Sequence, residues 1–299
     1  MMSTPRQIVP GRTYLVTRRC SQRQFLLRPD DTTNGIFLYG LAEAAQRFGI
    51  EVIAWYAASN HYHAVVHDPR GELPAFLERF HKFCAKALNR RWKRWENLWA
   101  SEPTCAVRLV EEQDVLEKVV YALVNPVADR LVDRVFEWPG ASSLRRMGRP
   151  ALTIPRPKLF FRETGPMPRD VKLIARTPRE WRGDAQSWVD RVHAEVAAVE
   201  QSVRKERLEN GTRLVGRQRV LAASAFDRPT THEPRRNRRP HVACRNIERR
   251  IRELAALRAF RAAYARARRR YADGERRVVF PAGTFFLRVV YGVCCSSPP

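Results

Sequence analysis

The sequence lacks the cysteine patterns and long apolar runs that mark several classes of protein. No Cys-x-x-Cys pair occurs among its six cysteines, at positions 20, 84, 105, 244, 294 and 295, so we expect free thiols and no cysteine-based zinc site. No apolar run reaches the roughly 18 residues of a membrane-spanning helix, and Arg288 interrupts the longest late candidate, residues 285–293. Residues 1–7 lack the apolar segment of a signal peptide, so the expected location is cytoplasmic, with no membrane partner.

Acidic residues are scarce relative to basic ones. The chain has 55 Lys plus Arg against 31 Asp plus Glu, a formal net charge of +24. Such an excess favours a polyanionic partner, because each phosphate contact releases counterions and adds affinity that does not depend on sequence. A metal hydrolase of small molecules fits this charge poorly. The length of 299 residues allows one large core or about two domains.

The first half of the chain alternates strand and helix patterns. β-branched and aromatic runs predict strands. Cap chemistry predicts that the first helix begins within Asp30, Asp31, Thr32 and Thr33 and ends at Gly49. The order strand, helix, strand, strand, helix, strand predicts an α+β fold, a ferredoxin-like antiparallel sheet with helices on one face and the other face left for chemistry. The expected strands are 13–17, 50–58, 61–67 and 105–110, and the helices run from 31 to 48 and from 74 to 88.

Two histidines flank one bulky residue in the third of these strands. Side chains alternate along a strand, so His61 and His63 point to one face and Tyr62 to the other. Two neutral imidazoles on one face can bind a single divalent ion. An isolated His-x-His is more often an ordinary surface pair, because short motifs have many false positives. His67 shares this face and is expected at its rim.

Tyr121 and Asn125 lie four residues apart near the end of a helix that is expected to start at Glu111. This spacing places them on one helix face. Alone, a tyrosine hydroxyl beside an amide oxygen means little. Beside a two-histidine metal site, the pair suggests a nucleophile carried next to a third ligand.

These two motifs resemble those of a known family. Asn60-His61-Tyr62-His63 resembles the Asn-His-x-His of HUH nucleases, and residues 121–127 resemble the Tyr-x-x-x-Asn-Pro-Val of single-tyrosine HUH transposases. Within these, the chain is most similar to the REP-associated tyrosine transposases, which share a downstream element seen here as residues 138–143, Trp-Pro-Gly-Ala-Ser-Ser. The likeness spans residues 8–145, which are expected to form an HUH catalytic domain.

The chain departs from the family pattern at two places. Ala58-Ser59 stands where Met-Pro is common, and residues 95–99 replace a glycine-rich stretch that often precedes the fourth strand. Neither change affects a residue that is expected to take part in the chemistry. The second one is expected to alter how DNA is held.

The resemblance implies an enzyme that transposes DNA. It implies that Tyr121 attacks single-stranded DNA to give a 5′-phosphotyrosine, and that His61, His63 and Asn125 hold one Mg²⁺ or Mn²⁺ ion. The implied partner is single-stranded DNA with hairpin ends. Binding it would place the cytoplasmic protein at the nucleoid. The protein is expected to be a monomer or a dimer. The alternative is a domesticated DNA-binding protein that kept the scaffold but lost transposition.

Basic side chains near these motifs are candidates for DNA contacts. Arg18 and Arg19 follow the first strand, and a row of cations lies along the second helix, where Trp92, Trp95 and Trp99 could stack on unpaired bases. An ordinary solvated surface is the alternative for each of these groups. The candidates are Arg18, Arg19, Lys82, Lys86, Arg90, Arg91, Arg94, Arg235 and Arg236.

The second half of the chain is less regular. Prolines punctuate residues 146–187, which predicts a linker. Residues 188–299 are expected to form a basic, mostly helical region of unknown role. Within it we expect a helix over 188–208, a basic loop over 228–240, and a long arginine-rich helix over 247–271 that is either a nucleic-acid face or a solvated helix packed on the core. A closing hairpin is expected over 278–293.

Overall fold

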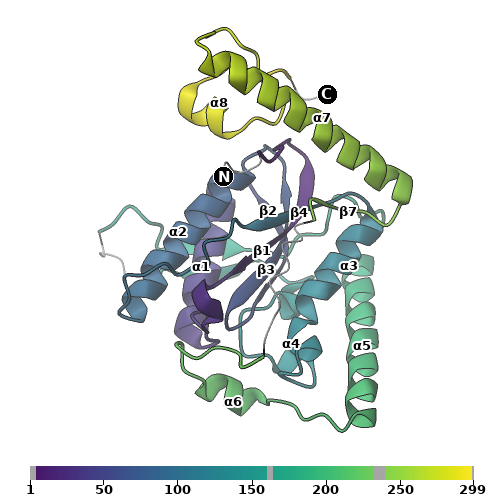
Figure 1. Cartoon of the computed structure of the whole chain (residues 1–299). Coiled ribbons are helices and arrows are strands. Elements are labelled where there is room, and N and C mark those ends of the chain that lie inside the picture. The colour runs from purple at the N-terminus through teal and green to yellow at the C-terminus, as the bar shows by residue number, and fades with distance from the viewer. Residues whose placement is uncertain (1–4, 160–163, 232–239, 298–299) are drawn as a thin grey trace.

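The computed structural model describes residues 5–159, 164–231 and 240–297, and it has an α+β architecture (Figure 1). A five-stranded sheet has the order β2-β3-β1-β4-β7. All neighbouring strands are antiparallel except the last pair, β4 and β7. The predicted ferredoxin-like order is therefore confirmed, with β7 added at one edge. The strands are β1 (Arg12–Arg19), β2 (Glu51–Ala57), β3 (His61–Asp68), β4 (Cys105–Leu109) and β7 (Val242–Ala243).

Two helices, α1 (Asp31–Phe48) and α2 (Leu73–Arg91), cover one face of the sheet. The α1 helix begins where Asp30 accepts a hydrogen bond from the Thr33 amide (2.9 Å), and it ends at Gly49, whose φ of 67° suits glycine. Apolar side chains from both helices bury Tyr62 and its neighbours on this face. The periodic pattern of apolar residues therefore decides which side of each helix faces the sheet.

The opposite face is also covered, contrary to the expectation that it would be open. It packs against α3 (Glu112–Leu123), and α5 (Ala185–Glu209) lies beside α3 in Figure 1 and packs on it. The reason is that most side chains on this face, such as Leu15, Ile53 and Val65, are apolar and need cover from water. Polar side chains lie at both ends of this face, His61 and His63 at the start of β3 and His67, paired with Thr13, at its end.

Residues after α4 (Asn125–Ala128) protect the outer edge of the sheet. The Trp138 indole donates to the Ala57 carbonyl (2.9 Å), and the Ala57 amide donates to the Ala141 carbonyl (2.8 Å). The Ser143 hydroxyl accepts a hydrogen bond from the Trp55 amide (3.0 Å). These bonds satisfy backbone groups of β2 that would otherwise form an exposed sheet edge. Three short 3₁₀ helices complete this half of the chain, at Ser21–Arg23, Val135–Glu137 and Leu144–Arg146.

The proline-rich segment 146–187, expected to be a linker, contains a two-stranded antiparallel sheet. Its strands are β5 (Leu152–Pro155) and β6 (Asp170–Leu173). Ile154, Val171 and Leu173 join the same apolar core as α1. The segment thus adds to the main core in spite of its prolines.

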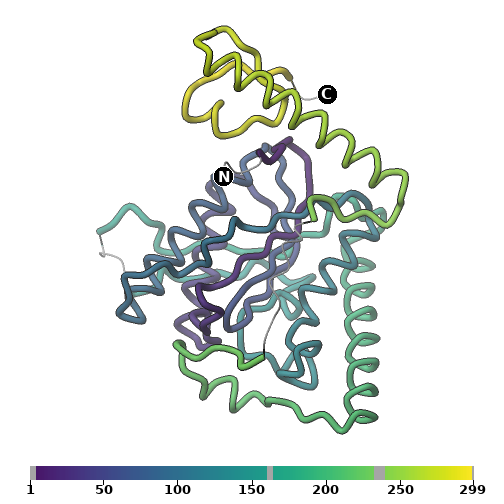
Figure 2. Tube along the Cα trace, in the orientation of Figure 1, coloured from purple at the N-terminus to yellow at the C-terminus, as the bar shows by residue number. Residues whose placement is uncertain are grey.

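The C-terminal part is mostly helical, as predicted, with α6 (Arg217–Ala222), α7 (Ile247–Ala272) and α8 (Phe286–Tyr291). The expected closing hairpin is wrong, because 286–291 is helical and ends at Gly292 with a φ of 62°. Phe280 pairs only with Cys295 in an isolated bridge and packs against Tyr264 and Tyr271 of α7. Figure 2 shows the chain after α5 crossing below the sheet to its other side.

The cysteines and the apolar character of the helices were both considered from the sequence. All six cysteines are free, as predicted. Across the described residues, no helix combines the length and the apolar character needed to cross a bilayer.

Asp68 offers a test of the turn between β3 and α2. Its buried carboxylate accepts hydrogen bonds from the amides of Gly71 (2.8 Å), Glu72 (2.9 Å) and Leu73 (2.9 Å). We expect Asp68→Ala to lower the free energy of unfolding by about 3 kcal/mol, because buried amides lose a charged acceptor. Asp31→Ala, in the exposed first turn of α1, should cost at most about 1 kcal/mol. Urea denaturation measures both, and equal losses would contradict this role of Asp68.

Candidate functional site

The pairing of β1 with β3 places the two predicted histidines at one end of the sheet. Thr17 lies opposite His63, and Arg19 lies opposite His61. The two imidazole rings share one face, with ring centroids 4.9 Å apart. His63 is buried and His61 is half-buried.

Hydrogen bonds hold the Nδ1 atom of each ring. His61 Nδ1 lies 2.7 Å from Asn60 Oδ1, and His63 Nδ1 lies 2.7 Å from the Thr17 hydroxyl. An amide oxygen only accepts hydrogen bonds, so His61 Nδ1 carries a proton, and Nε2 keeps its lone pair when the ring is neutral. Both rings are thereby oriented so that Nε2 is the candidate ligand atom, an arrangement common in metal sites.

His63 is held in the neutral form. Burial lowers its pKa well below the ordinary value of 6.5, and the positive charges of His61 and Arg19 lower it further. Neutral imidazole is the form that binds metal ions. The environment of His63 therefore favours a ligand over a charged surface side chain.

Tyr121, from the last turn of α3, lies against this pair. Its ring centroid is 5.3 Å from that of His63, in an edge-to-face arrangement, and half of the side chain is exposed. The Lys118 ammonium, one helical turn earlier, lies 5.8 Å from the centre of the tyrosine ring. The helix buries Val115, Val119 and its other apolar residues against the sheet, which leaves Tyr121 at the rim of the covered face.

Asn125 starts α4, directly after the end of α3. The helix breaks here because Pro126 has no amide hydrogen to donate. The Asn125 side-chain oxygen is buried and has no hydrogen-bond partner within the described part of the chain. A buried acceptor without a hydrogen-bond partner costs free energy, so such an atom usually binds a water molecule or an ion.

These donors fit a divalent cation. By their chemistry, imidazole nitrogens from His61 and His63 with an amide oxygen from Asn125 would make a mixed nitrogen and oxygen set that suits Mg²⁺ or Mn²⁺. The orphaned oxygen of Asn125 is the observation that supports this fit.

A groove of about 290 Å³ lies beside the tyrosine, between α3 and α5. Its floor is apolar and its rim carries Glu117 and Glu195. Both carboxylates are paired with arginines, Glu117 with Arg245 and Glu195 with Arg191. The groove is lined by Gln113, Leu116, Glu117, Val120, Tyr121, Val124, Glu195 and Val199.

Of the two arginines that end β1, the structure brings only one to this site. Arg19 is exposed on the histidine face, and its charge acts on His63. Arg18 points to the other face, where its guanidinium contacts His81 Nδ1 (2.8 Å) and the Thr104 hydroxyl (3.0 Å). Period-two alternation separates the two side chains.

The other predicted DNA contacts lie along or beyond α2. Arg91 forms two hydrogen bonds with Asp30, and Arg94 donates to Gln24 (2.7 Å), so both have structural partners. Lys82 pairs with Glu78. Lys86 and Arg90 are exposed. Arg235 and Arg236 lie outside the described residues.

Three residues of the site were not given a role from the sequence. Thr17 orients His63, Asn60 orients His61, and Lys118 lies beside Tyr121. The spacing of Lys118, three residues before Tyr121, could have indicated its place, whereas Thr17 needs the strand register. His67, expected at the rim, is buried with its Nδ1 atom 2.8 Å from the Thr13 hydroxyl.

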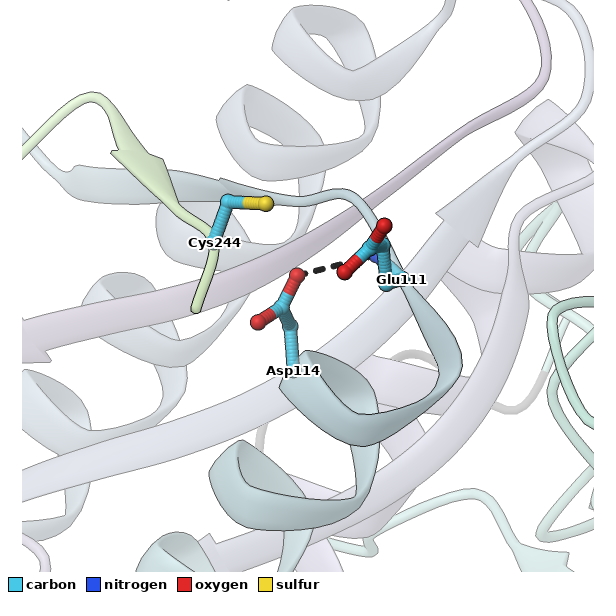
Figure 3. Close-up of side chains that lie close together, drawn as sticks. All are labelled: Glu111, Asp114 and Cys244. Carbon is cyan, nitrogen blue, oxygen red and sulfur yellow. Dashed lines mark hydrogen bonds between the residues drawn. The ribbon is translucent and has the colours of Figure 1, made fainter. Parts of the chain in front are cut away.

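Glu111, Asp114 and Cys244 form a second cluster of possible metal ligands, shown in Figure 3. Asp114 accepts hydrogen bonds from the amides of Glu111 (3.0 Å) and Arg245 (2.8 Å). The Glu111 carboxylate pairs with Arg249 (3.2 Å). These oxygens already cap α3 and attach the segment of β7 and α7 to it, so the cluster is structural.

Several solved structures are similar to this chain, and two of them are transposases. One is a REP-associated tyrosine transposase bound to a REP hairpin, with 21% identity over 49% of this chain and 85% of that chain, at a TM-score of 0.42. The other is a candidate transposase from Deinococcus radiodurans, with 19% identity over 40% of this chain and 95% of that chain, at a TM-score of 0.30. No family model and no curated protein matches.

Thr17→Val tests whether the hydrogen bond to His63 prepares a metal site. Losing the partner that orients a metal-binding histidine typically costs 10- to 100-fold in affinity, and we expect Mn²⁺ to bind this variant weaker by about that factor. Thr13→Val is the matched control, because Thr13 makes the same bond to His67 on the same strand pair. Isothermal titration with Mn²⁺ measures both. Equal effects of the two changes, or none, would count against the assignment.

Proposed function

We propose that this protein is a transposase that cleaves and rejoins single-stranded DNA, with Tyr121 as the nucleophile. The observation that carries the proposal is the contact between the rings of Tyr121 and His63, which come from α3 and β3. These two residues belong to the two motifs that resemble the HUH transposases. A chance pair of motifs would have no reason to meet in space.

The reaction exchanges one ester bond for another. The Tyr121 oxygen attacks the phosphorus, the bond from phosphorus to the 3′ oxygen breaks, and that oxygen leaves as a 3′ hydroxyl after taking up a proton. The product is a 5′-phosphotyrosine, and attack by a different 3′ hydroxyl reverses the step and joins two strands. Because the covalent link conserves the bond energy, strand transfer needs no ATP.

His61, His63 and Asn125 would hold a divalent ion, Mg²⁺ or Mn²⁺, beside the tyrosine. When bound, it supplies Lewis-acid stabilisation of the charge that develops on the phosphate oxygens. Neutral His63 can bind the ion without first losing a proton, and the hydrogen bond to Asn60 orients the ring of His61.

Charged side chains around the site are suited to a phosphate substrate. Arg19 is exposed at the same end of the sheet as His61, where it can hold a neighbouring phosphate. Lys118 places a positive charge over the ring of Tyr121. The excess of basic residues in the whole chain supports DNA as the substrate. A strand with hairpin ends is the substrate that the family resemblance implies.

Tyr121→Phe tests the nucleophile. Labelled single-stranded DNA from the flanks of the protein's own gene, including any hairpin, is incubated with protein and Mn²⁺. We expect the unaltered protein to give an adduct that survives SDS, and Tyr121→Phe to give none, since it lacks the attacking oxygen. Tyr291→Phe is the control, because Tyr291 is similarly exposed (60%) but lies on α8.

The adduct assay also separates the two functions considered for this chain. An adduct in Tyr121→Phe would mean that another residue is the nucleophile. Binding of this DNA by the unaltered protein with no adduct would favour a domesticated DNA-binding protein.

Asn125→Ala tests the third ligand. We expect this variant to need about 10- to 100-fold more Mn²⁺ to form the same amount of adduct. In EDTA, its free energy of unfolding should stay within about 1 kcal/mol of the unaltered value, because the oxygen that is removed has no partner to lose. Urea denaturation in EDTA measures the second effect. A large loss of stability with an unchanged need for Mn²⁺ would assign Asn125 a structural role instead.

A further inference from the structure

Trp95 is the most exposed large hydrophobic side chain of the described residues, with 90% of its surface accessible. It lies in the turn between α2 and β4. The two neighbouring tryptophans have partners: Trp92 donates to the Leu26 carbonyl (3.1 Å), and buried Trp99 donates to the His81 carbonyl (3.0 Å). Of the three tryptophans considered for base stacking, Trp95 is thus the one whose ring is accessible to a ligand.

Hydrogen bonds hold the turn that carries Trp95 on both sides of the tryptophan. The Arg94 amide donates to the Asn89 carbonyl (2.8 Å), and the Asn89 side chain donates to the Glu96 carbonyl (2.7 Å). Lys93 has a φ of 52°, a conformation that non-glycine residues adopt only when their surroundings hold it. An ordered turn presents an aromatic ring at a low entropic cost on binding.

The same turn is joined to the end of the sheet that carries His61. The Ser21 hydroxyl donates to the Asn97 carbonyl (2.8 Å), and the Ala100 amide donates to the Arg19 carbonyl (2.9 Å). Arg19 lies opposite His61 in the strand register. A strand of DNA that leaves the proposed site past Arg19 would pass the end of the sheet to which the turn with Trp95 is attached.

The surface around Trp95 is positively charged. Lys86, Arg90 and Lys93 are exposed, and within the described chain no ion pair involves any of them. Between residues 86 and 96 the sequence has one acidic residue, Glu96. Unpaired cations around an accessible aromatic ring are the features of surfaces that bind single-stranded nucleic acid.

We infer that Trp95 stacks on an unpaired base of single-stranded DNA, while Lys86, Arg90 and Lys93 hold the phosphates on either side of that base. The inference rests on the proposed function for the path of the strand. Stacking tolerates any base, so this contact adds affinity for unpaired DNA without reading its sequence. It would lie where the chain departs from the glycine-rich stretch common in the family that it resembles.

Trp95→Ala tests the stacking contact. We expect it to weaken the binding of fluorescein-labelled oligo-dT by about 5- to 100-fold in anisotropy titrations, and to leave the binding of a labelled duplex of equal length unchanged, since paired bases offer no free face. Trp95→Phe keeps an aromatic face and should stay within about threefold of the unaltered protein. Tyr291→Ala, an exposed aromatic residue on α8, is the matched control and should change neither affinity.

The titrations are made with Tyr121→Phe protein in EDTA, so that no covalent step contributes. A selective loss for oligo-dT in Trp95→Ala supports the inference even if the unaltered protein forms no adduct, an outcome that would count against the proposed function alone. Unchanged binding of oligo-dT would overturn the inference. So would an equal loss for oligo-dT and duplex, or a change of oligomeric state without a change in DNA affinity.

Discussion

The two faces of β3 must be buried against different layers, and this constraint organises the molecule. Tyr62 and Val66 enter the core with α1 and α2, while Val65 enters the core with α3 and α5. A slip of one residue in the pairing of β1 with β3 would exchange these two sets. The same register places Thr17 against His63, so the packing that stabilises the sheet also orients the candidate ligand.

The strand order and the helix that carries Tyr121 follow from local sequence patterns. The Asp30 cap and the Gly49 terminus bound α1 as expected, and the alternation along β3 predicts that His61 and His63 share a face. The meeting of Tyr121 with His63 was an expectation from family resemblance, because no local rule fixes the position of α3 on the sheet. The alternation along β1 predicts that Arg18 and Arg19 point to opposite faces, but the partners of Arg18, His81 and Thr104, depend on tertiary packing.

Other features depend on tertiary packing that the sequence does not state. The run from 284 to 293 reads as a strand by its β-branched residues, but in the structure 286–291 forms α8, which ends at Gly292. Trp92, Trp95 and Trp99 look alike in sequence, and only the bonds to Leu26 and His81 distinguish the two that have partners. The packing of α5 on α3 involves a part of the chain with no recognised family pattern.

The attachment of α7 to the first turn of α3 has a mechanical consequence. At the opposite end of the helix from Tyr121, Asp114 accepts a hydrogen bond from the Arg245 amide, and Glu111 forms an ion pair with the Arg249 guanidinium. A helix is stiff along its axis, so a displacement of the segment of β7 and α7 (residues 242–272) would shift α3 as a whole and Tyr121 with it. Removing residues 242–272 would therefore remove the interactions of Arg245 with Asp114 and of Arg249 with Glu111. The range of positions sampled by the Tyr121 side chain would then widen.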